Sequence, residues 1–536
     1  MTATDTRAEP SFDQRLLLQL SMVVWAGILL AIMAMAPLDA GFSSDDGAYG
    51  IQVRSLVDDG RWALDRPVPV VPVDNEGVVN GWRTTDGPVA YPNHPVYIQL
   101  LRASSDVIGE DLGLRLLVFL GALLAPLVAW KLSDELEMGW GAGAFWLVAL
   151  SPLAVHSTGL WAHAPTAALA GAATIVVART RRRGPPGSDA IVVAATLAAG
   201  VLLRREMLLF AAALLVAWLV LRWCRRTVTA VGVSAIAVAA AVVAERTVRQ
   251  WIATDRLDSS VAGNETAGWI ADQVGAAWHT LIEPSHVGGL VGAVALLGAG
   301  LVIAGAVRIR RQDPNGGRML LVAGAAVLAL RVLLGDAELS SGIVVAWPIA
   351  TAGVIVGWAD DRAHRFLAGT VGLFVVAVLV TQHPDGGGLE WGGRYFSPAL
   401  AAVAVLASGG LWRLWQADRT IRAAAVAVLL APTLAGVLAA GQIRERNADV
   451  VAYVDQLNSS VVITDQPALP RVAWSTVPDT AWYRATSDDV DELLGLMSDA
   501  GVETITLQGF GDVLVDETHY SVEQPQRGLR LLTLRS

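Results

Sequence analysis

Long apolar runs without charged residues alternate with short polar segments over the first 440 residues of the chain. A helix needs about 20 such residues to cross a hydrocarbon core about 30 Å thick. The runs predict thirteen membrane-spanning helices, at residues 16–37, 112–130, 140–156, 161–178, 190–203, 207–222, 228–244, 286–306, 319–334, 341–358, 366–381, 395–411 and 421–440. The pair 190–203 and 207–222 fits either one bent helix or two short helices. The first run is longer than a signal-peptide core and no small-residue cleavage site follows it, so we interpret it as a retained span.

Arginine clusters occupy alternate short loops between these runs, at residues 179–183, 222–226, 308–318, 362–365 and 413–422. Basic loops of membrane proteins stay in the cytoplasm. The alternation therefore predicts a multi-pass protein of the cell membrane with a cytoplasmic N-terminal tail over residues 1–15 and an odd number of spans. The first loop, 38–111, and the polar tail, 441–536, are then expected outside the cytoplasm.

The tail over residues 441–536 has the pattern of a small α/β domain, separate from the membrane domain over residues 16–440. Alternating or β-branched residues predict strands at 461–464, 502–507 and 529–534. A helix is expected from Asp488 to Ala500, with Ser487 as its N-cap and Gly501 at its end. The tail contains no catalytic motif, and we interpret it as a supporting or acceptor-positioning domain. The predicted fold class is a polytopic α-helical membrane protein with an extracytoplasmic α/β domain.

Composition agrees with this interpretation. Hydrophobic residues make up 54% of the 536 residues and charged residues only 16%, against about 25% charged in a soluble domain. The mean hydropathy is +0.49. The net charge of −10 comes from carboxylates in the first outer loop and the tail, so the chain is not a nucleic-acid-binding protein. Its single cysteine, Cys224, excludes an internal disulfide.

An acidic pair in the segment Ser43-Ser44-Asp45-Asp46-Gly47-Ala48-Tyr49 is the sharpest chemical signal. Asp45 follows Pro37 by eight residues, at most about 30 Å of extended chain, so the pair lies at the outer membrane surface. Two adjacent carboxylates repel each other, and this raises the proton affinity of at least one of them. Such a carboxylate suits a general base acting on a hydroxyl group. The same residues also fit the acidic start of a surface helix beginning near Gly47.

Four elements in order resemble the bacterial GT-C glycosyltransferases, of the protein O-mannosyltransferase and aminoarabinose transferase type. They are the acidic pair with the helix-like run after it and the later Tyr91-Pro92-Asn93-His94-Pro95, then Trp161-Ala162-His163-Ala164-Pro165, Leu203-Arg204-Arg205-Glu206, and Gly388-Leu389-Glu390-Trp391-Gly392-Gly393-Arg394-Tyr395-Phe396-Ser397-Pro398. The sequence departs from the family pattern at two positions. Asp46 stands where the family usually has Glu, and His163 stands where it often has an acid.

The resemblance implies transfer of a sugar from a polyprenyl-phosphate donor to an acceptor outside the cytoplasm: an envelope glycan, a lipid or a protein. Asp45, or its neighbour Asp46, would act as the general base. Contacts to the acceptor or to a metal would come from His163, Tyr49 and Glu206. No cofactor is assigned, and a divalent metal is left open.

Departure of the lipid phosphate leaves negative charge, which fixed guanidinium groups stabilise. The candidates for the donor phosphate are Arg204, Arg205, Arg394, Tyr395 and His94. The arginines also fit pairing with Glu206 or Glu390. The expected partners are the lipid-linked sugar, its acceptor and membrane lipids.

Two other classes of function compete with a transferase. A transporter or flippase of a lipid-linked sugar would be expected to show internal repeats and charges near the bilayer midplane. The chain shows no repeat, and its charges gather at the outer ends of the helices. A non-catalytic envelope scaffold would not require an acidic pair beside the first span. The pattern therefore favours the transferase.

Overall fold

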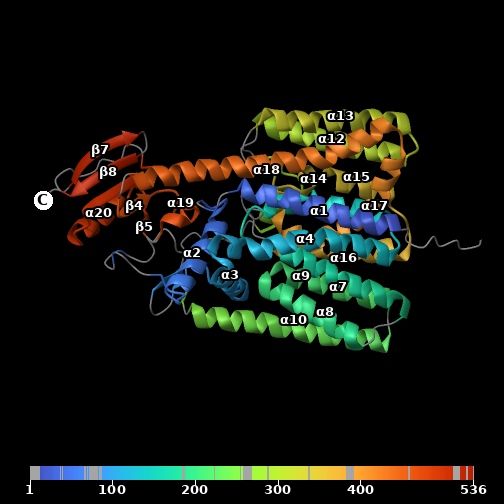
Figure 1. The fold of residues 1–536 in the computed structure, drawn as a ribbon, viewed down its shortest axis with the longest axis horizontal. Helices are drawn as coiled ribbons and strands as arrows, with labels where there is room; N and C mark the ends of the chain where they lie inside the picture. The colour runs from blue at the N-terminus through green and yellow to red at the C-terminus, as the bar shows by residue number, and fades with distance from the viewer. Residues whose placement is uncertain are drawn as a thin grey trace, which may run out of the picture.

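The protein is a bundle of roughly aligned helices with a small α/β domain at one end (Figure 1). The computed structural model describes residues 12–534 apart from 37, 39, 65–67, 69–70, 72–81, 84–86, 184–186, 223, 254, 257–268, 286–288, 336–338, 382–390, 457–458, 478, 511–519 and 527–528. The predicted N-terminal tail therefore lies almost wholly outside the described residues.

The helices up to the C-terminal domain are α1 (Phe12–Ala34), α2 (Ser44–Asp58), α3 (Pro95–Ile108), α4 (Glu110–Leu136), α5 (Gly141–Ala149), α6 (Pro152–His156), α7 (His163–Arg183), α8 (Gly187–Leu203), α9 (Glu206–Leu221), α10 (Arg225–Ile252), α11 (Trp269–Leu281), α12 (Gly289–Arg310), α13 (Pro314–Leu334), α14 (Ile343–Ala346), α15 (Pro348–Gly357), α16 (Arg362–Thr381), the 3-10 helix η4 (Arg394–Ala399), α17 (Leu400–Gln416) and α18 (Arg419–Gln456). Three two-residue strands, β1 (Trp82–Arg83), β2 (Pro88–Val89) and β3 (Asp255–Arg256), form a small sheet of order β2-β1-β3. This sheet joins the segment between α2 and α3 to the segment after α10.

Eight of the described helices are long and apolar enough to cross a membrane: α1, α4, α10, α12, α13, α16, α18 and the continuous η4–α17. Three shorter apolar helices, α8, α9 and α15, accompany them. Large apolar side chains stand exposed on the bundle, with Val220 and Leu333 each 82% exposed, as expected for surfaces that face lipid rather than water. The chain is a multi-pass membrane protein, and the count of thirteen spans stays a prediction.

Proline divides two of the predicted spans. The run 140–156 forms α5 and α6, because Pro152 lacks an N–H and Ser151 caps the second helix through a 3.1 Å bond from the Leu153 amide. The run 341–358 forms α14 and α15, with Pro348 at the first position of α15. The ambiguous pair 190–203 and 207–222 is resolved as two helices, α8 and α9.

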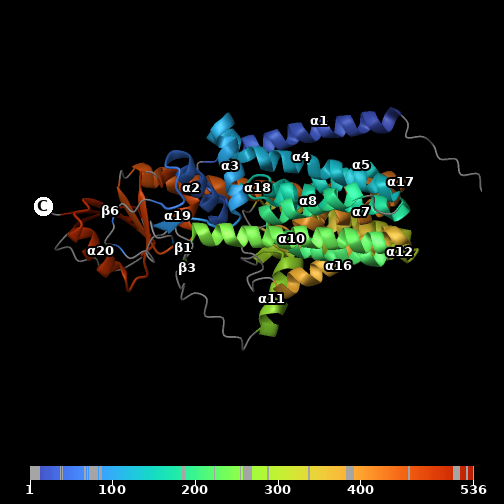
Figure 2. The ribbon, with the colours of Figure 1, turned by 90° about the horizontal axis from the view of Figure 1, so that it is seen from below.

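α11 lies across the direction of the bundle helices (Figure 2). Its Val274 and Trp278 side chains are 66% and 46% exposed. An apolar exposed face on a helix that does not run along the bundle is typical of a segment lying in the membrane interface.

The C-terminal domain continues directly from α18, whose 38 residues make a helix about 57 Å long. It contains β4 (Val461–Thr464), α19 (Leu469–Val472), the 3-10 helix η5 (Trp474–Thr476), β5 (Ala481–Arg484), α20 (Val490–Asp499), β6 (Thr504–Gln508), β7 (Tyr520–Gln526) and β8 (Leu529–Leu534). The sheet has the order β5-β4-β6-β8-β7, with β4 parallel to both of its neighbours and β8 antiparallel to β6 and β7.

The predicted strands correspond to β4, β6 and β8, whereas β5 and β7 were not predicted. Helix α20 begins later than expected, with Asp489 rather than Ser487 at its N-cap and no side-chain capping bond. Gly501 ends the turn after it with a positive φ of 74°, the conformation for which glycine is favoured. The predicted boundary at residue 441 falls inside the continuous helix α18.

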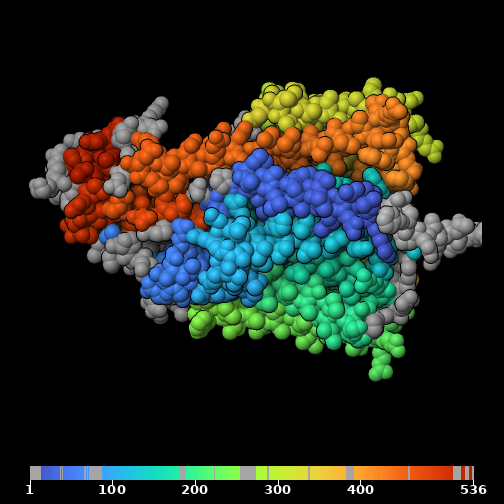
Figure 3. Space-filling model, in the orientation of Figure 1, coloured from blue at the N-terminus to red at the C-terminus, as the bar shows by residue number. Residues whose placement is uncertain are grey.

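Helices α2 and α3, between α1 and α4 in the chain, lie where the bundle meets the C-terminal domain (Figures 1 and 3). α3 packs against α4, and α2 packs against α3 on one side and α19 on the other. The acidic pair therefore lies where three parts of the chain meet.

Candidate functional site

The acidic pair occupies the first turn of α2. The Ser43 side chain caps this helix by accepting a 3.3 Å hydrogen bond from the Asp46 amide. Carboxylates in a first turn are favoured by the helix dipole. The motif therefore does form the acidic start of a helix, which begins at Ser44 and not near Gly47 as expected. Successive residues of a helix point about 100° apart, so Asp45 and Asp46 meet different surroundings.

Asp46 is buried and fully bonded. Its side chain is 2% exposed, and its Oδ2 lies 2.8 Å from a terminal nitrogen of Arg444, which is 1% exposed. The same oxygen accepts a 3.0 Å bond from the Phe42 amide, and Oδ1 accepts a 2.5 Å bond from the Leu160 amide. Both carboxylate oxygens therefore serve the fold.

Arg444 connects the segments around Asp46. Besides the carboxylate, it donates to the carbonyl oxygens of Ala40 at 3.1 Å and Thr158 at 2.7 Å. It thus ties α18 to the end of the first span, to the first turn of α2 and to the turn before α7. The sequence carried no signal for this residue, because its partner Asp46 is 398 residues away.

Asp45 is the more accessible member of the pair, with 30% of its side chain exposed. Its Oδ2 lies 3.2 Å from a terminal nitrogen of Arg394, at the start of η4. Arg394 donates from its other terminal nitrogen to the Tyr395 hydroxyl at 3.1 Å and stacks 4.9 Å from that ring. Glu390, the other predicted partner of Arg394, lies outside the described residues.

His163 links Arg394 to Arg204 by a directed chain of hydrogen bonds. Arg204 lies 3.2 Å from His163 Nε2, and a guanidinium only donates, so this ring nitrogen accepts. The proton of the neutral ring is then on Nδ1, which donates to Ser397 Oγ at 2.9 Å, and Ser397 donates to the Arg394 carbonyl at 2.5 Å. Neither ring nitrogen of His163 is left for a metal ion.

The two arginines of the α8–α9 junction have different partners. Arg204 is 8% exposed and pairs with Glu206 at 2.6 Å. Arg205 is 49% exposed on its side chain and contacts Glu245 at 3.2 Å and the Asn93 amide oxygen at 2.9 Å. The pairing of Arg204 with Glu206 foreseen from the sequence is present, and Arg205 presents the more open guanidinium.

Aromatic residues of α2 and α3 form a buried wall beside these charges. The Tyr49 ring lies 4.6 Å from that of Tyr91 and 5.6 Å from that of Tyr97. The Tyr97 hydroxyl donates to the Leu160 carbonyl at 2.7 Å. Burial raises the pKa of the Tyr49 phenol well above its usual range, so this hydroxyl is a neutral donor.

His94 precedes α3 in a left-handed conformation, with φ of 54°. It is 6% exposed, and its Nδ1 is buried without a hydrogen-bond partner among the described residues. Burial, together with the positive charge of Arg204, lowers the pKa of His94 to about 3. His94 is therefore neutral at physiological pH and offers an imidazole rather than a cation.

The site-residue predictions converge in one region. Asp45, Arg394, His163, Arg204 and Glu206 are joined by consecutive contacts. Tyr49 and His94 lie on either side of Tyr91, whose ring centroid is 4.6 Å from that of Tyr49 and 6.4 Å from that of His94. Arg205 lies at its edge. Among the described residues, no three His, Cys, Asp or Glu side chains are grouped to hold a metal ion.

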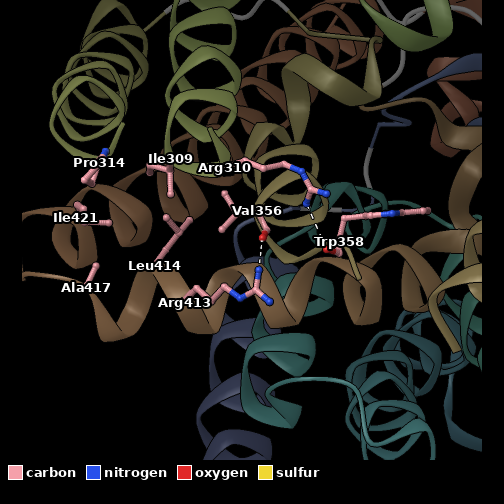
Figure 4. A pocket seen from close by; sticks show the side chains of 9 residues that line it. All are labelled: Ile309, Arg310, Pro314, Val356, Trp358, Arg413, Leu414, Ala417 and Ile421. Carbon is pink, nitrogen blue, oxygen red and sulfur yellow. Dashed lines mark hydrogen bonds between the residues drawn. The ribbon is translucent and has the colours of Figure 1, made fainter. Parts of the chain in front are cut away.

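A cavity of about 480 Å³ lies at the opposite end of the bundle, between the ends of α12, α15 and α17 (Figure 4). Arg310 and Arg413 border it, and both donate to carbonyl oxygens at the end of α15: Arg310 to Ile355 at 2.8 Å and Arg413 to Val356 at 2.6 Å. The 17 residues of α17, about 25 Å of helix, separate this cavity from η4. It is therefore separate from the region around Asp45.

No protein-family model and no curated protein matches the sequence. Among solved structures, ArnT from Cupriavidus metallidurans bound to undecaprenyl phosphate matches with a TM-score of 0.51 and 12% sequence identity, over 98% of each chain. The chain shares the fold of this ArnT, which is a GT-C glycosyltransferase. The oligosaccharyltransferase of Archaeoglobus fulgidus matches with a TM-score of 0.47 and 14% identity, over 96% of this chain and 73% of its own. The match to ArnT confirms the GT-C resemblance of the sequence motifs at the level of the fold alone.

Proposed function

We propose that this GT-C chain is a membrane glycosyltransferase that moves a sugar from a polyprenyl-phosphate donor to a hydroxyl group of an extracytoplasmic acceptor. The observation that carries the proposal is Asp45, a partly exposed carboxylate paired with Arg394 in a polar region at the end of a membrane bundle. The ArnT structure of the same fold holds undecaprenyl phosphate, the leaving part of such a donor.

Asp45 serves as the general base. Its carboxylate takes the proton of the acceptor hydroxyl, whose oxygen attacks the anomeric carbon of the sugar. The bond from that carbon to the phosphate oxygen breaks, and the electron pair leaves with the lipid phosphate. A single displacement of this kind inverts the anomeric centre. Asp46 does not suit this role, because N–H groups occupy both of its oxygens in a buried setting.

The leaving phosphate gains negative charge, and a fixed guanidinium stabilises it. Arg205 has the open side chain for this contact, while the buried pair of Arg204 and Glu206 holds the α8–α9 junction in place. Arg394 orients Asp45 through their 3.2 Å contact. The donor and acceptor sides of the reaction thus draw on different elements of the fold.

The test is sugar transfer by purified protein in lipid nanodiscs. Radiolabelled undecaprenyl-phosphate sugars are the donors, and membranes of a source strain that lacks the protein supply the acceptor. Asp45→Asn is expected to reduce transfer about 10³-fold by removing the base. Asp58→Asn, at the other end of the same helix, is the matched control and is expected to leave transfer unchanged.

Two results would count against the proposal. Full transfer by Asp45→Asn would remove Asp45 from the mechanism. Absence of transfer by the wild type with every donor, together with movement of the lipid-linked sugar across the bilayer, would replace the transferase with a flippase.

A further inference from the structure

The C-terminal domain packs against the start of α2, the helix that carries Asp45. The Val472 carbonyl, in α19, accepts a 2.7 Å hydrogen bond from the Gly41 amide. A Cβ atom on Gly47 would lie 1.6 Å from the Arg471 carbonyl oxygen. The backbone of α19 therefore touches α2 two residues after Asp45, at a place where only glycine fits (Figure 1).

A second row of contacts continues this interface along α2. A Cβ atom on Gly50 would lie 2.7 Å from the ring of Trp474. Arg54 stacks 4.8 Å from the same ring and donates to the Ser475 carbonyl at 3.1 Å. These contacts hold α19 and η5 in register with the acidic turn.

The guanidinium group of Arg471, at this interface, makes few hydrogen bonds with the described residues. Its Nε is buried and has no hydrogen-bond partner among the described residues. One terminal nitrogen makes a long, 3.4 Å bond to the nearby Pro467 carbonyl. A guanidinium carries five N–H donors, so Arg471 retains donors for a further ligand.

The charged residues around Arg471 indicate the sign of the charge that such a ligand would carry. Burial and the like charge of Arg484 lower the pKa of Arg471, and the Asp45 carboxylate opposes this shift. Asp45 already has Arg394 as its ion-pair partner at 3.2 Å. Arg471 forms no ion pair among the described residues, so its positive charge is left to attract an anionic ligand.

We infer that Arg471 binds an anionic group, a phosphate or a carboxylate, on the acceptor, so that the C-terminal domain selects which hydroxyl reaches Asp45. This inference rests on the proposed function. The donor phosphate is the other source of an anion. The donor keeps its lipid in the bilayer, whereas Arg471 belongs to α19 of the C-terminal domain, which packs against α2 beyond the end of the bundle (Figure 1).

Binding of simple probes to the full chain in nanodiscs tests the inference. Glycerol 3-phosphate stands for an anionic acceptor, glycerol for a neutral one and undecaprenyl phosphate for the donor carrier. Dissociation constants come from the dependence of the unfolding temperature on probe concentration. Arg471→Gln is expected to weaken glycerol 3-phosphate binding about tenfold or more and to leave undecaprenyl phosphate binding unchanged. Arg471→Lys keeps the charge and is expected to restore part of the affinity.

Arg54→Gln is the matched control, because it removes an arginine from the same interface without touching the charges at Asp45. Equal losses in Arg54→Gln and Arg471→Gln would show a structural role only and overturn the inference. So would a loss confined to undecaprenyl phosphate, or a wild type that binds glycerol as well as glycerol 3-phosphate. Because these readouts need no catalysis, an absence of sugar transfer would count against the proposed function alone.

Discussion

Replacement of Asp46 by asparagine is expected to destabilise the protein rather than act on catalysis directly. The change removes the charge that faces Arg444 across 2.8 Å, with both side chains 2% exposed or less. Breaking one partner of a buried pair costs about 3–5 kcal/mol, because the remaining charge stays buried without compensation. The Asn side chain also has one acceptor oxygen where the carboxylate has two. Arg444 keeps its bonds to the Ala40 and Thr158 carbonyls, so we expect a value near the lower limit, about 3 kcal/mol.

Thermal unfolding in nanodiscs measures this effect. At about 2 °C per kcal/mol for a large chain, a loss of about 3 kcal/mol lowers the melting temperature by roughly 6 °C. Asp45→Asn is the internal comparison, since the Asp45 side chain is 30% exposed and exposed pairs contribute about 0–1 kcal/mol. The two adjacent substitutions should therefore separate, one reducing stability and the other reducing transfer.

A double substitution gives the decisive result. Arg444→Met removes the buried cation, so the double variant Asp46→Asn with Arg444→Met no longer carries an unpaired charge. We expect it to cost at least about 1 kcal/mol less than the sum of the single variants. Additive effects, or an unchanged melting temperature for Asp46→Asn, would refute the assignment of Asp46 to the fold.

Three further predictions concern other parts of the site. Gly47→Ala is expected to lower both the melting temperature and transfer, since its Cβ would meet a carbonyl oxygen at 1.6 Å, while Gly27→Ala, with open space around it, is expected to be neutral or to stabilise by up to about 1 kcal/mol. His94 has a pKa lowered to about 3, so the unfolded chain binds more protons and stability should fall as pH drops below about 6.5. His94→Asn, which tolerates the left-handed conformation, should reduce that slope between pH 5 and 7 in thermal unfolding; identical slopes would contradict the burial argument. Arg394→Gln is expected to reduce transfer about 10²-fold, whereas Arg318→Gln, from an exposed pair with both side chains more than 40% exposed, should retain wild-type rates.

The membrane character of the chain and part of its C-terminal domain followed from the sequence alone. Hydropathy and length identify spanning helices without reference to their neighbours, because every backbone polar group in lipid has to be satisfied within its own helix. The strands β4, β6 and β8 were recognisable from local alternation. The existence of α2 was also readable from the acidic residues at its start, although the sequence placed that start near Gly47 and the helix begins at Ser44.

Features that depend on distant partners were not accessible in this way. The short strand β5 is recognisable only by its parallel pairing with β4. The closeness of α2 and α19 requires two glycines and a carbonyl more than 400 residues apart in the chain to meet.

The acidic pair shows most clearly which features follow from the sequence and which depend on the tertiary structure. Its position at the end of the first span was determined by the sequence, but the two carboxylates were interchangeable there. In the folded protein the helical step of about 100° turns Asp46 toward Arg444 and the interior, while Asp45 faces Arg394 and remains partly exposed. Only the packing of α18, α2 and η4 decides which carboxylate is buried, because burial is a property of the surrounding elements and not of the two residues themselves.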